Sequence, residues 1–411
     1  MTTESQHRLS FAHFCKLADG QTYNPETVVK HLQEFQVAIP SWALGAGATR
    51  FGRFSIGGEP SSLEQKIEDV ALVNKLTQCA NSISLHIPWD IPEDATAIQQ
   101  FAGEQGLHFD SVNSNTFQDH KNQKHSYKFG SLSHSDPRVR QQAIEHNEQV
   151  IEIGEALGAK VLTVWLADGS SFPGQSSFKR SLEHTQESLK AIYKCLPEDG
   201  KMLIEYKPFE PSFYSMVIPD WGTSLALANA CGSNAFSLVD LGHHLPNTNI
   251  EQIVATLQWQ KKLGGFHFND SKFADDDLTV GSMKPYQLFL IFNELVGSIQ
   301  DENSISWMID ASHNLKDPLE DLMQSLQNIQ VALAKALLID QRALKEAQEN
   351  NDVSMCQQIL QNAFETDVRP LVAEARLRSG GVLDPISEYR SLEIRRQLIE
   401  ARGAHTVASG L

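Results

Sequence analysis

The 411-residue sequence lacks several features that mark secreted, membrane or disulfide-bonded proteins. Its apolar runs fall short of the roughly 20 residues that a membrane-spanning helix needs. Its first residues, MTTESQHRLSFAHFCK, do not follow the basic-then-apolar pattern of a signal peptide. The five cysteines are scattered and form no C-x-x-C pair. We therefore expect reduced thiols, no membrane partner and a cytoplasmic location.

Positive charge is also scarce. The chain has 34 basic residues against 51 acidic ones, which gives a formal net charge of −17. A protein that binds nucleic acid or an anionic membrane must present a basic face to the phosphates. We therefore expect no nucleic-acid partner. Acidic residues gathered at one site would instead attract cations.

Short β-branched or aromatic runs alternate along the chain with segments whose apolar residues recur at helical spacing. Eight such runs are candidate strands: 35–42, 82–89, 109–117, 160–169, 201–210, 236–244, 263–270 and 305–314. Helical spacing is clear over 138–157 and 249–264, and Asp136-Pro137 and Asp317-Pro318 are helix-start signals. No G-x-G-x-x-G follows the first strand, which disfavours a doubly wound sheet. The pattern predicts an α/β fold of the (β/α)8 TIM barrel type.

The helical patterns at the two ends predict extensions of this barrel. We expect an N-terminal helical extension over 1–33, the (β/α)8 catalytic barrel over 34–335 and a C-terminal helical extension over 336–411. No strand-like run interrupts the last of these segments. Its helices would cover the outside of the barrel or contribute oligomer contacts.

Active sites of such barrels lie at the C-terminal ends of the strands. The last four predicted strands carry lysine, imidazole and acidic side chains there: Glu205 and Lys207, Asp240 and His243, His267 with Asp275 and Asp277, and Asp310. Glu205 and Lys207 are two residues apart, so both should face the same way. Asp270 and Asp276, in the same loop as Asp275, are interpreted as capping or solvated carboxylates.

Like charges this close repel one another unless a cation lies among them. One cation could be held by four side chains from consecutive strand ends: Glu205, Asp240, His267 and Asp310. A second could be held by His243, Asp275 and Asp277, with Asp240 serving both. Each residue alone is more simply a helix cap or a salt-bridge partner, but their coincidence favours a two-metal site. The oxygen-rich set with imidazole and no thiolate suits Mn²⁺, Mg²⁺ or Co²⁺ better than structural zinc.

Aromatic side chains stand at other strand ends: Trp42, Trp89, Phe117 and Trp165. Such rings line sugar sites because their faces pack against C–H groups, although the same rings serve equally well as plain core residues. His86, in SLHIPWD, has the alternative interpretation of a hydrogen-bonded core histidine.

These motifs carry a family resemblance. The bacterial L-rhamnose isomerases of broad sugar specificity, which are xylose-isomerase-like barrels, resemble this chain in SLHIPWD, NSNTF, HSYKFGSLSH, LTVWLADGSSFPGQ, EYKPFEPSFYS, VDLGHHLPNTNIE, GGFHFNDSKFADDDL and MIDASHN. The resemblance runs from about residue 36 to the C-terminal helices. It implies a homotetrameric aldose–ketose isomerase with two divalent cations per subunit. The implied substrates are L-rhamnose and related aldoses such as L-mannose, L-lyxose and D-allose.

The resemblance also implies roles for individual residues. The family's structural metal ligands fall on Glu205, Asp240, His267 and Asp310, and its catalytic metal ligands on His243, Asp275 and Asp277. Its substrate-contacting positions fall on His86, Trp165, Lys207, Trp42 and Phe117. We expect the catalytic residues to be Lys207, His243 and Asp310. We expect the cations to be Mn²⁺, with Co²⁺, Mg²⁺ or Zn²⁺ as alternatives.

Aldose–ketose isomerisation moves one hydrogen from C2 to C1 and one proton from O2 to O1. Two Lewis acids at the oxygens would permit a direct hydride shift, with Lys207 donating a hydrogen bond to O1. The predicted strand ends offer no obvious glutamate base for carbon, because Glu205 is assigned to a metal. Three alternatives remain: a keto-sugar 3-epimerase with one metal and a glutamate pair, a multi-zinc endonuclease, and a metal-stabilised sugar-binding barrel without catalysis. The charge of −17 disfavours the endonuclease.

Overall fold

The computed structural model describes residues 3–45, 54–297, 305–311 and 315–405. Within these residues eight parallel strands form one sheet whose order follows the chain. The strands are β1 (Ile39–Pro40), β2 (Ser82–Ile87), β3 (His108–Ser114), β4 (Val161–Val164), β6 (Lys201–Glu205), β8 (Ala235–Asp240), β9 (Leu263–Phe268) and β10 (Ser306–Ile309). Ala38, next to β1, forms a parallel bridge with Met308 of β10, which closes the sheet. The predicted (β/α)8 barrel is confirmed.

The strands are shorter than the sequence pattern indicated, because their ladders stop where the chain turns into the βα loops. After β1, the residues that had been assigned to the same strand form a short 3₁₀ helix, η1 (Ser41–Ala43). Gly169 had been assigned to the fourth strand but lies in β5 (Gly169–Ser170). This strand pairs antiparallel with β7 (Ser215–Met216), so a two-stranded ribbon that was not predicted joins the loops after β4 and β6. Residues 312–314 of the predicted eighth strand lie outside the described residues.

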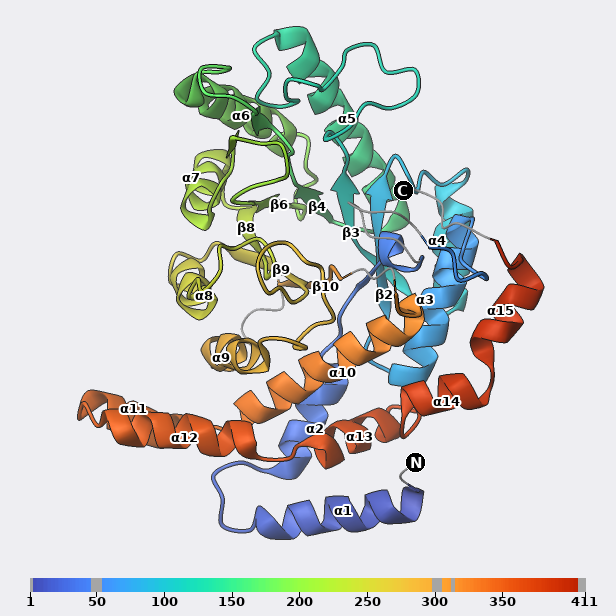
Figure 1. The fold of residues 1–411 in the computed structure, drawn as a ribbon, viewed down its shortest axis with the longest axis vertical. Coiled ribbons are helices and arrows are strands. Elements are labelled where there is room, and N and C mark those ends of the chain that lie inside the picture. Colours follow the sequence, from blue (N-terminus) through green and yellow to red (C-terminus); the bar gives the residue numbers. More distant parts are fainter. Residues whose placement is uncertain (1–2, 46–53, 298–304, 312–314, 406–411) are drawn as a thin grey trace.

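Helices cover the outside of the barrel (Figure 1). They are α3 (Leu63–Thr77), α4 (Ala95–Glu104), α5 (Pro137–Leu157), α6 (Phe178–Tyr193), α7 (Trp221–Cys231), α8 (Ile250–Trp259), α9 (Pro285–Leu295) and α10 (Pro318–Leu337). Asp136 and Asp317 accept backbone N–H bonds at the starts of α5 and α10, as the sequence predicted. Helix α8 ends earlier than predicted, since Lys261 has a φ of 55° and β9 begins shortly after it.

The N-terminal helices pack against part of the C-terminal helical segment on one side of the barrel. The N-terminal helices are α1 (Glu4–Leu17) and α2 (Pro25–Glu34), and the C-terminal ones are α11 (Gln341–Glu349), α12 (Val353–Glu365), α13 (Arg369–Arg378), α14 (Pro385–Ser391) and α15 (Ile394–Arg402). Both N-terminal helices pack against α13, and α2 and α13 also pack against α10. A hydrogen bond between His7 and Glu374, with 2.8 Å between Nε2 and Oε2, joins α1 to α13. Within the described parts of the chain, no helix is both long and apolar enough to cross a bilayer.

A buried ion pair fastens the first barrel helix to the loop after β2. Lys66 of α3 and Asp90 are each 1% exposed, and Lys66 Nζ lies 2.6 Å from Asp90 Oδ1. The other carboxylate oxygen, Oδ2, accepts a 2.9 Å hydrogen bond from the backbone N–H of His86 and another from the hydroxyl of Ser41 in η1. The pair therefore holds together three segments at the end of the barrel where active sites lie.

We expect Lys66→Met to lower the free energy of unfolding by about 3–5 kcal/mol, because Asp90 would stay buried without its cationic partner. Urea denaturation would measure the change. The matched control is Lys30→Met. Lys30 and Glu34 form an ion pair whose side chains are 75% and 62% exposed, so its loss should change stability by about 0.5 kcal/mol or less. Equal losses in the two variants would contradict this role of the buried pair.

Candidate metal centre

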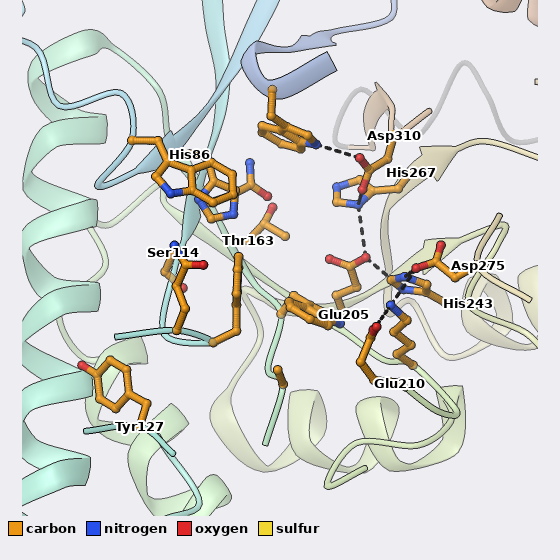
Figure 2. A pocket seen from close by; sticks show the side chains of 18 of the residues that line it. His86, Ser114, Tyr127, Thr163, Glu205, Glu210, His243, His267, Asp275 and Asp310 are labelled. Atoms are coloured by element: carbon orange, nitrogen blue, oxygen red, sulfur yellow. Dashed lines mark hydrogen bonds and ion pairs between the residues drawn. The ribbon is translucent and has the colours of Figure 1, made fainter. Parts of the chain in front are cut away.

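The predicted site residues line one cavity at the C-terminal ends of the strands. The cavity has a volume of about 680 Å³. Its walls include eleven of the predicted residues: Trp42, His86, Phe117, Trp165, Glu205, Lys207, His243, His267, Asp275, Asp277 and Asp310. The remaining predicted ligand, Asp240, is 1% exposed and contacts His267 beneath the wall. Figure 2 shows acids and histidines gathered on one side of the cavity, with His86 and Tyr127 on the other.

Four strand ends contribute the first group of ligand-type side chains. One donor atom each from Glu205, Asp240, His267 and Asp310 lies within 4.8 Å of all the others. His267 Nδ1 is at the centre of this group, 3.3 Å from Glu205 Oε1, 3.4 Å from Asp310 Oδ2 and 3.9 Å from Asp240 Oδ2. The barrel thus brings together the four residues that the sequence assigned to one cation.

A second group lies beside the first and shares Asp240 with it. Donor atoms of Asp240, His243 and Asp275 also lie within 4.8 Å of one another. His243 extends between the groups, with Nδ1 3.1 Å from Glu205 Oε1 and Nε2 3.5 Å from Asp275 Oδ2. Asp277 lines the same cavity but is not part of this compact group, and its backbone has a φ of 49°.

The other two acids of the same segment have the local role expected of them. Asp270 accepts hydrogen bonds from the backbone N–H groups of Ser271, Met283 and Lys284. Asp276 accepts from the N–H groups of Lys272 and Phe273. These two carboxylates cap turns, and the loop they hold carries Asp275 and Asp277.

The ionisable groups of the site perturb one another strongly. Burial raises the pKa of Asp240 to about 7, and repulsion by Asp275 adds to this effect while His243 opposes it. Burial, followed by repulsion from Asp275, also raises the pKa of Asp277 well above its ordinary value. Burial would lower the pKa of His267, but the nearby carboxylates of Glu205 and Asp310 outweigh it and raise the pKa to about 10. Bound protons therefore relieve the repulsion between the acids when no cation is present.

The donor atoms fit divalent cations. Asp240 Oδ2, His243 Nδ1 and His267 Nδ1 are buried but make no hydrogen bond of ordinary geometry with the described residues. Buried polar atoms in native proteins nearly always have a hydrogen-bond or metal partner. Three buried donor atoms of this kind in one cluster therefore fit a cation-binding site. Carboxylate oxygens and imidazole nitrogens without thiolate suit Mn²⁺, Mg²⁺ or Co²⁺. The two groups could each hold one ion, with Asp240 contributing to both.

Lys207 has partners that the sequence did not indicate. It is 3% exposed, it is paired with Glu210, and its Nζ lies 2.6 Å from Asp275 Oδ2 and 5.1 Å from the centre of the Trp165 ring. Glu210 lines the cavity, although the sequence reasoning missed it. The predicted strand over 201–210 would have placed it on the opposite face from Lys207, but β6 ends at Glu205. The signal that could have found Glu210 is Pro208, which disfavours continuation of a central strand.

An aromatic wall faces the charged side of the cavity. His86 stacks on Trp89 with 4.2 Å between ring centres, and Phe117 lies 5.0 Å from Trp165. Burial lowers the pKa of His86 to about 3, so its ring is neutral. Trp42 links the two sides, because its Nε1 donates a 2.9 Å hydrogen bond to Asp310 Oδ1.

Several polar residues of the cavity wall were not predicted. They are Asn113, Ser114, Gln118, Asp119, Tyr127, Lys128 and Thr163. These residues come from β3, β4 and the loop after β3. Several of them lie within the motifs NSNTF, HSYKFGSLSH and LTVWLADGSSFPGQ, but residue type and spacing assigned none of them a chemical role. Alternation along the strands identifies side chains that face the barrel interior, such as those of Asn113 and Thr163, but only when the ladder register is also known.

We expect Mn²⁺ affinity to rise as the pH increases from about 6 to about 8. His267, with a pKa of about 10, must lose a proton to bind a cation throughout this range, whereas Asp240, with a pKa of about 7, must do so mainly in its lower half. Affinity should therefore increase up to about tenfold per pH unit for each proton released, and more steeply below pH 7. Calorimetric titration in two buffers of different ionisation heat measures the Mn²⁺ affinity and the number of protons released on binding. Affinity that is constant or falls with pH would contradict the assignment.

Comparisons with known proteins agree with this geometry. The family model of the xylose isomerase-like TIM barrel matches residues 78–303. A "probable sugar isomerase" of Mesorhizobium japonicum is 52% identical over 382 residues, which cover 92% of this chain and 89% of that protein. The xylose isomerase of Thermus thermophilus is 24% identical over 267 residues, or 59% of this chain and 67% of that protein. The crystal structure of 3-keto-D-glucoside 4-epimerase from E. coli covers 71% of this chain and 97% of its own with a TM-score of 0.52 and 12% identity, a likeness of fold alone. The chain belongs to the xylose isomerase-like TIM barrel family of sugar isomerases.

Proposed function

We propose that the protein is a metal-dependent aldose–ketose isomerase that interconverts L-rhamnose and L-rhamnulose through a 1,2-hydride shift. The observation that carries this proposal is the pair of ligand groups that share Asp240 inside a sugar-sized cavity beside a buried lysine. Two cations held so close together suit a reaction in which two neighbouring oxygens of one substrate change charge. The relative from Mesorhizobium japonicum, named a probable sugar isomerase, supports the reaction class.

The preference for L-rhamnose rests on the motifs that resemble L-rhamnose isomerases, and the aromatic wall is compatible with it. C6 of L-rhamnose is a methyl group. Apolar rings such as Trp89 and Phe117 favour a methyl group at this position over the hydroxymethyl group of an ordinary hexose. Other aldoses, among them L-mannose, L-lyxose and D-allose, are proposed as further substrates. The homotetramer that the resemblance implies stays a prediction.

When bound, two divalent cations supply Lewis acidity at the sugar's O1 and O2. Glu205, Asp240, His267 and Asp310 would hold one of them, and His243, Asp275 and Asp277, with Asp240, the other. Lys207 is positioned by Glu210 and Asp275 to donate a hydrogen bond to O1, where negative charge develops. The neutral His86 ring and the indole rings around it exclude water and orient the carbon chain.

A keto-sugar 3-epimerase is the second candidate, and Glu210 is the observation that favours it. With Glu205, it gives the cavity the two glutamates that such an enzyme would use as acid and base. However, both belong to β6 and the segment that follows it, whereas epimerisation needs the two groups on opposite faces of the sugar. Glu210 is also paired with Lys207. The arrangement therefore favours isomerisation over epimerisation. A sugar-binding barrel without catalysis is also disfavoured, because it would leave the buried Lys207 without a role.

The metal-loaded protein should convert L-rhamnose to its ketose, and EDTA should abolish turnover. Added Mn²⁺ or Co²⁺ should restore it, because the proposed reaction needs the Lewis acidity that the cations would supply. Ketose formation from a panel of aldoses would be measured by chromatography, with a panel of ketoses tested for epimerisation in parallel. Epimerised ketose without aldose would move the function to the second candidate, and full activity in a metal-free protein would exclude both.

Aldose labelled with deuterium at C2 should give ketose that keeps the label at C1 in ordinary water. A hydride that passes directly between carbons never meets solvent, whereas a proton carried by a base through an enediol exchanges with water. The converse experiment, unlabelled aldose in D₂O, should introduce almost no deuterium on carbon. Mass spectrometry of the ketose measures both. Extensive exchange in both directions would identify an enediol route, for which Glu210 is a cavity-lining glutamate not assigned to a metal.

A further inference from the structure

A buried hydrogen bond lies behind the charged wall of the cavity, between two residues that no step of the proposed reaction uses. The hydroxyl of Tyr206 and Nε2 of His244 are 2.7 Å apart, and the two rings meet edge to face with 5.4 Å between centres. Tyr206 is 1% exposed and His244 is 8% exposed. Neither is among the residues that line the cavity.

The bond joins the two segments that carry most of the site. Tyr206 lies between Glu205 and Lys207, and His244 directly follows His243. Neighbouring residues of an extended chain face opposite sides, so Tyr206 turns away from the cavity while its two neighbours line it. The ladder between β6 and β8 ends at the pair Glu205 and Leu238. Tyr206 and His244 therefore connect the segments that follow β6 and β8, beyond the point where backbone pairing stops.

The relative position of these segments determines how far apart the two ligand groups lie. On the cavity side, Glu205 belongs to the first group and His243 to the second, and the two side chains are 3.1 Å apart. A shift of the loop after β8 against the end of β6 would change this distance first. We infer that Tyr206 and His244 are positioning residues, whose hydrogen bond sets the spacing between the two cation-binding groups. The inference rests on the two-cation site of the proposed function.

Removal of the Tyr206–His244 hydrogen bond is expected to weaken cation binding. Residues that orient metal ligands from behind usually contribute 10- to 100-fold to metal affinity or activity. Tyr206→Phe removes the hydroxyl but keeps the ring that packs behind β6, and it leaves a buried imidazole nitrogen without its partner. The loop that carries His243 can then shift, and the loss should appear in cation binding rather than in the contacts with the sugar.

The experiment compares Tyr206→Phe with Tyr389→Phe, a matched control. Tyr389 of α14 is 2% exposed, and its hydroxyl donates a 2.8 Å hydrogen bond to Asp317 at the start of α10. Calorimetric titration of Mn²⁺ into metal-free protein should show affinity about 10- to 100-fold lower for Tyr206→Phe and unchanged for Tyr389→Phe. The melting temperatures of the metal-free variants should fall alike. At saturating Mn²⁺, Tyr206→Phe should recover kcat with an unaltered KM for the sugar.

A double-mutant cycle tests the bond itself. His244→Leu should weaken Mn²⁺ binding about as much as Tyr206→Phe, and the double variant should be no weaker than either single one, because both changes remove the same interaction. Losses that add, or a Tyr206→Phe protein that binds Mn²⁺ as tightly as the Tyr389→Phe control, would overturn the inference. The tyrosine variant decides the matter even if His244→Leu does not fold.

The outcome is distinguishable from that of the proposed function. Weakened Mn²⁺ binding in Tyr206→Phe, with no ketose formed by the wild-type protein, would support the positioning role and reject the isomerase. Equal Mn²⁺ affinities together with normal ketose formation would reject the positioning role alone. A wild-type protein that binds no Mn²⁺ would overturn both.

Discussion

The carboxylate of Asp240 is almost completely buried, yet repulsion from Asp275, Glu205 and Asp310 acts on it. An isolated buried carboxylate is strongly disfavoured, and several together are more so. Here the backbone N–H groups of Gly242 and His243 and the side chain of Asn269 donate to one oxygen, Oδ1, at 2.7–3.1 Å. The other oxygen, Oδ2, is buried and makes no hydrogen bond with any residue that the structure describes. The rest of the site is arranged around this acceptor.

The barrel keeps these mutually repelling acids together because rigid strands hold each acid in place. Closure of the sheet between Ala38 and Met308 brings the first and last strands together. As a result Trp42, near the start of the barrel, can donate to Asp310 at its end. The Lys66–Asp90 pair holds η1 and the end of β2, and the Tyr206–His244 bond holds the segments after β6 and β8. The second of these links acts on backbone that lies just beyond the ladder between β6 and β8.

The cavity has two chemically different sides, and the proposed reaction needs both. The charged side would stabilise negative charge that develops on the sugar's oxygens, whereas the aromatic side packs against its carbon chain. Lys207 lies where the sides meet, paired with acids and 5.1 Å from the ring centre of Trp165. Its acidic partners compensate the positive charge of the lysine in a buried position, and that charge would stabilise a developing oxyanion.

The sequence by itself determined the barrel, the order of its strands and the residues that stand at their ends. Alternating strand and helix patterns are local, and eight of them in succession have few ways to close. The three acids and the one histidine of the first ligand group were found in this way, since parallel strands bring their C-terminal ends to one edge. Only the tertiary structure decided where each ladder stops. The early end of β6 turned Glu210 into the cavity and gave Lys207 its partners, and the loop after β9 placed Asp275, but not Asp277, in the compact second group. Loop conformation depends on contacts between segments far apart in the chain, such as Tyr206 with His244, and no local pattern records them.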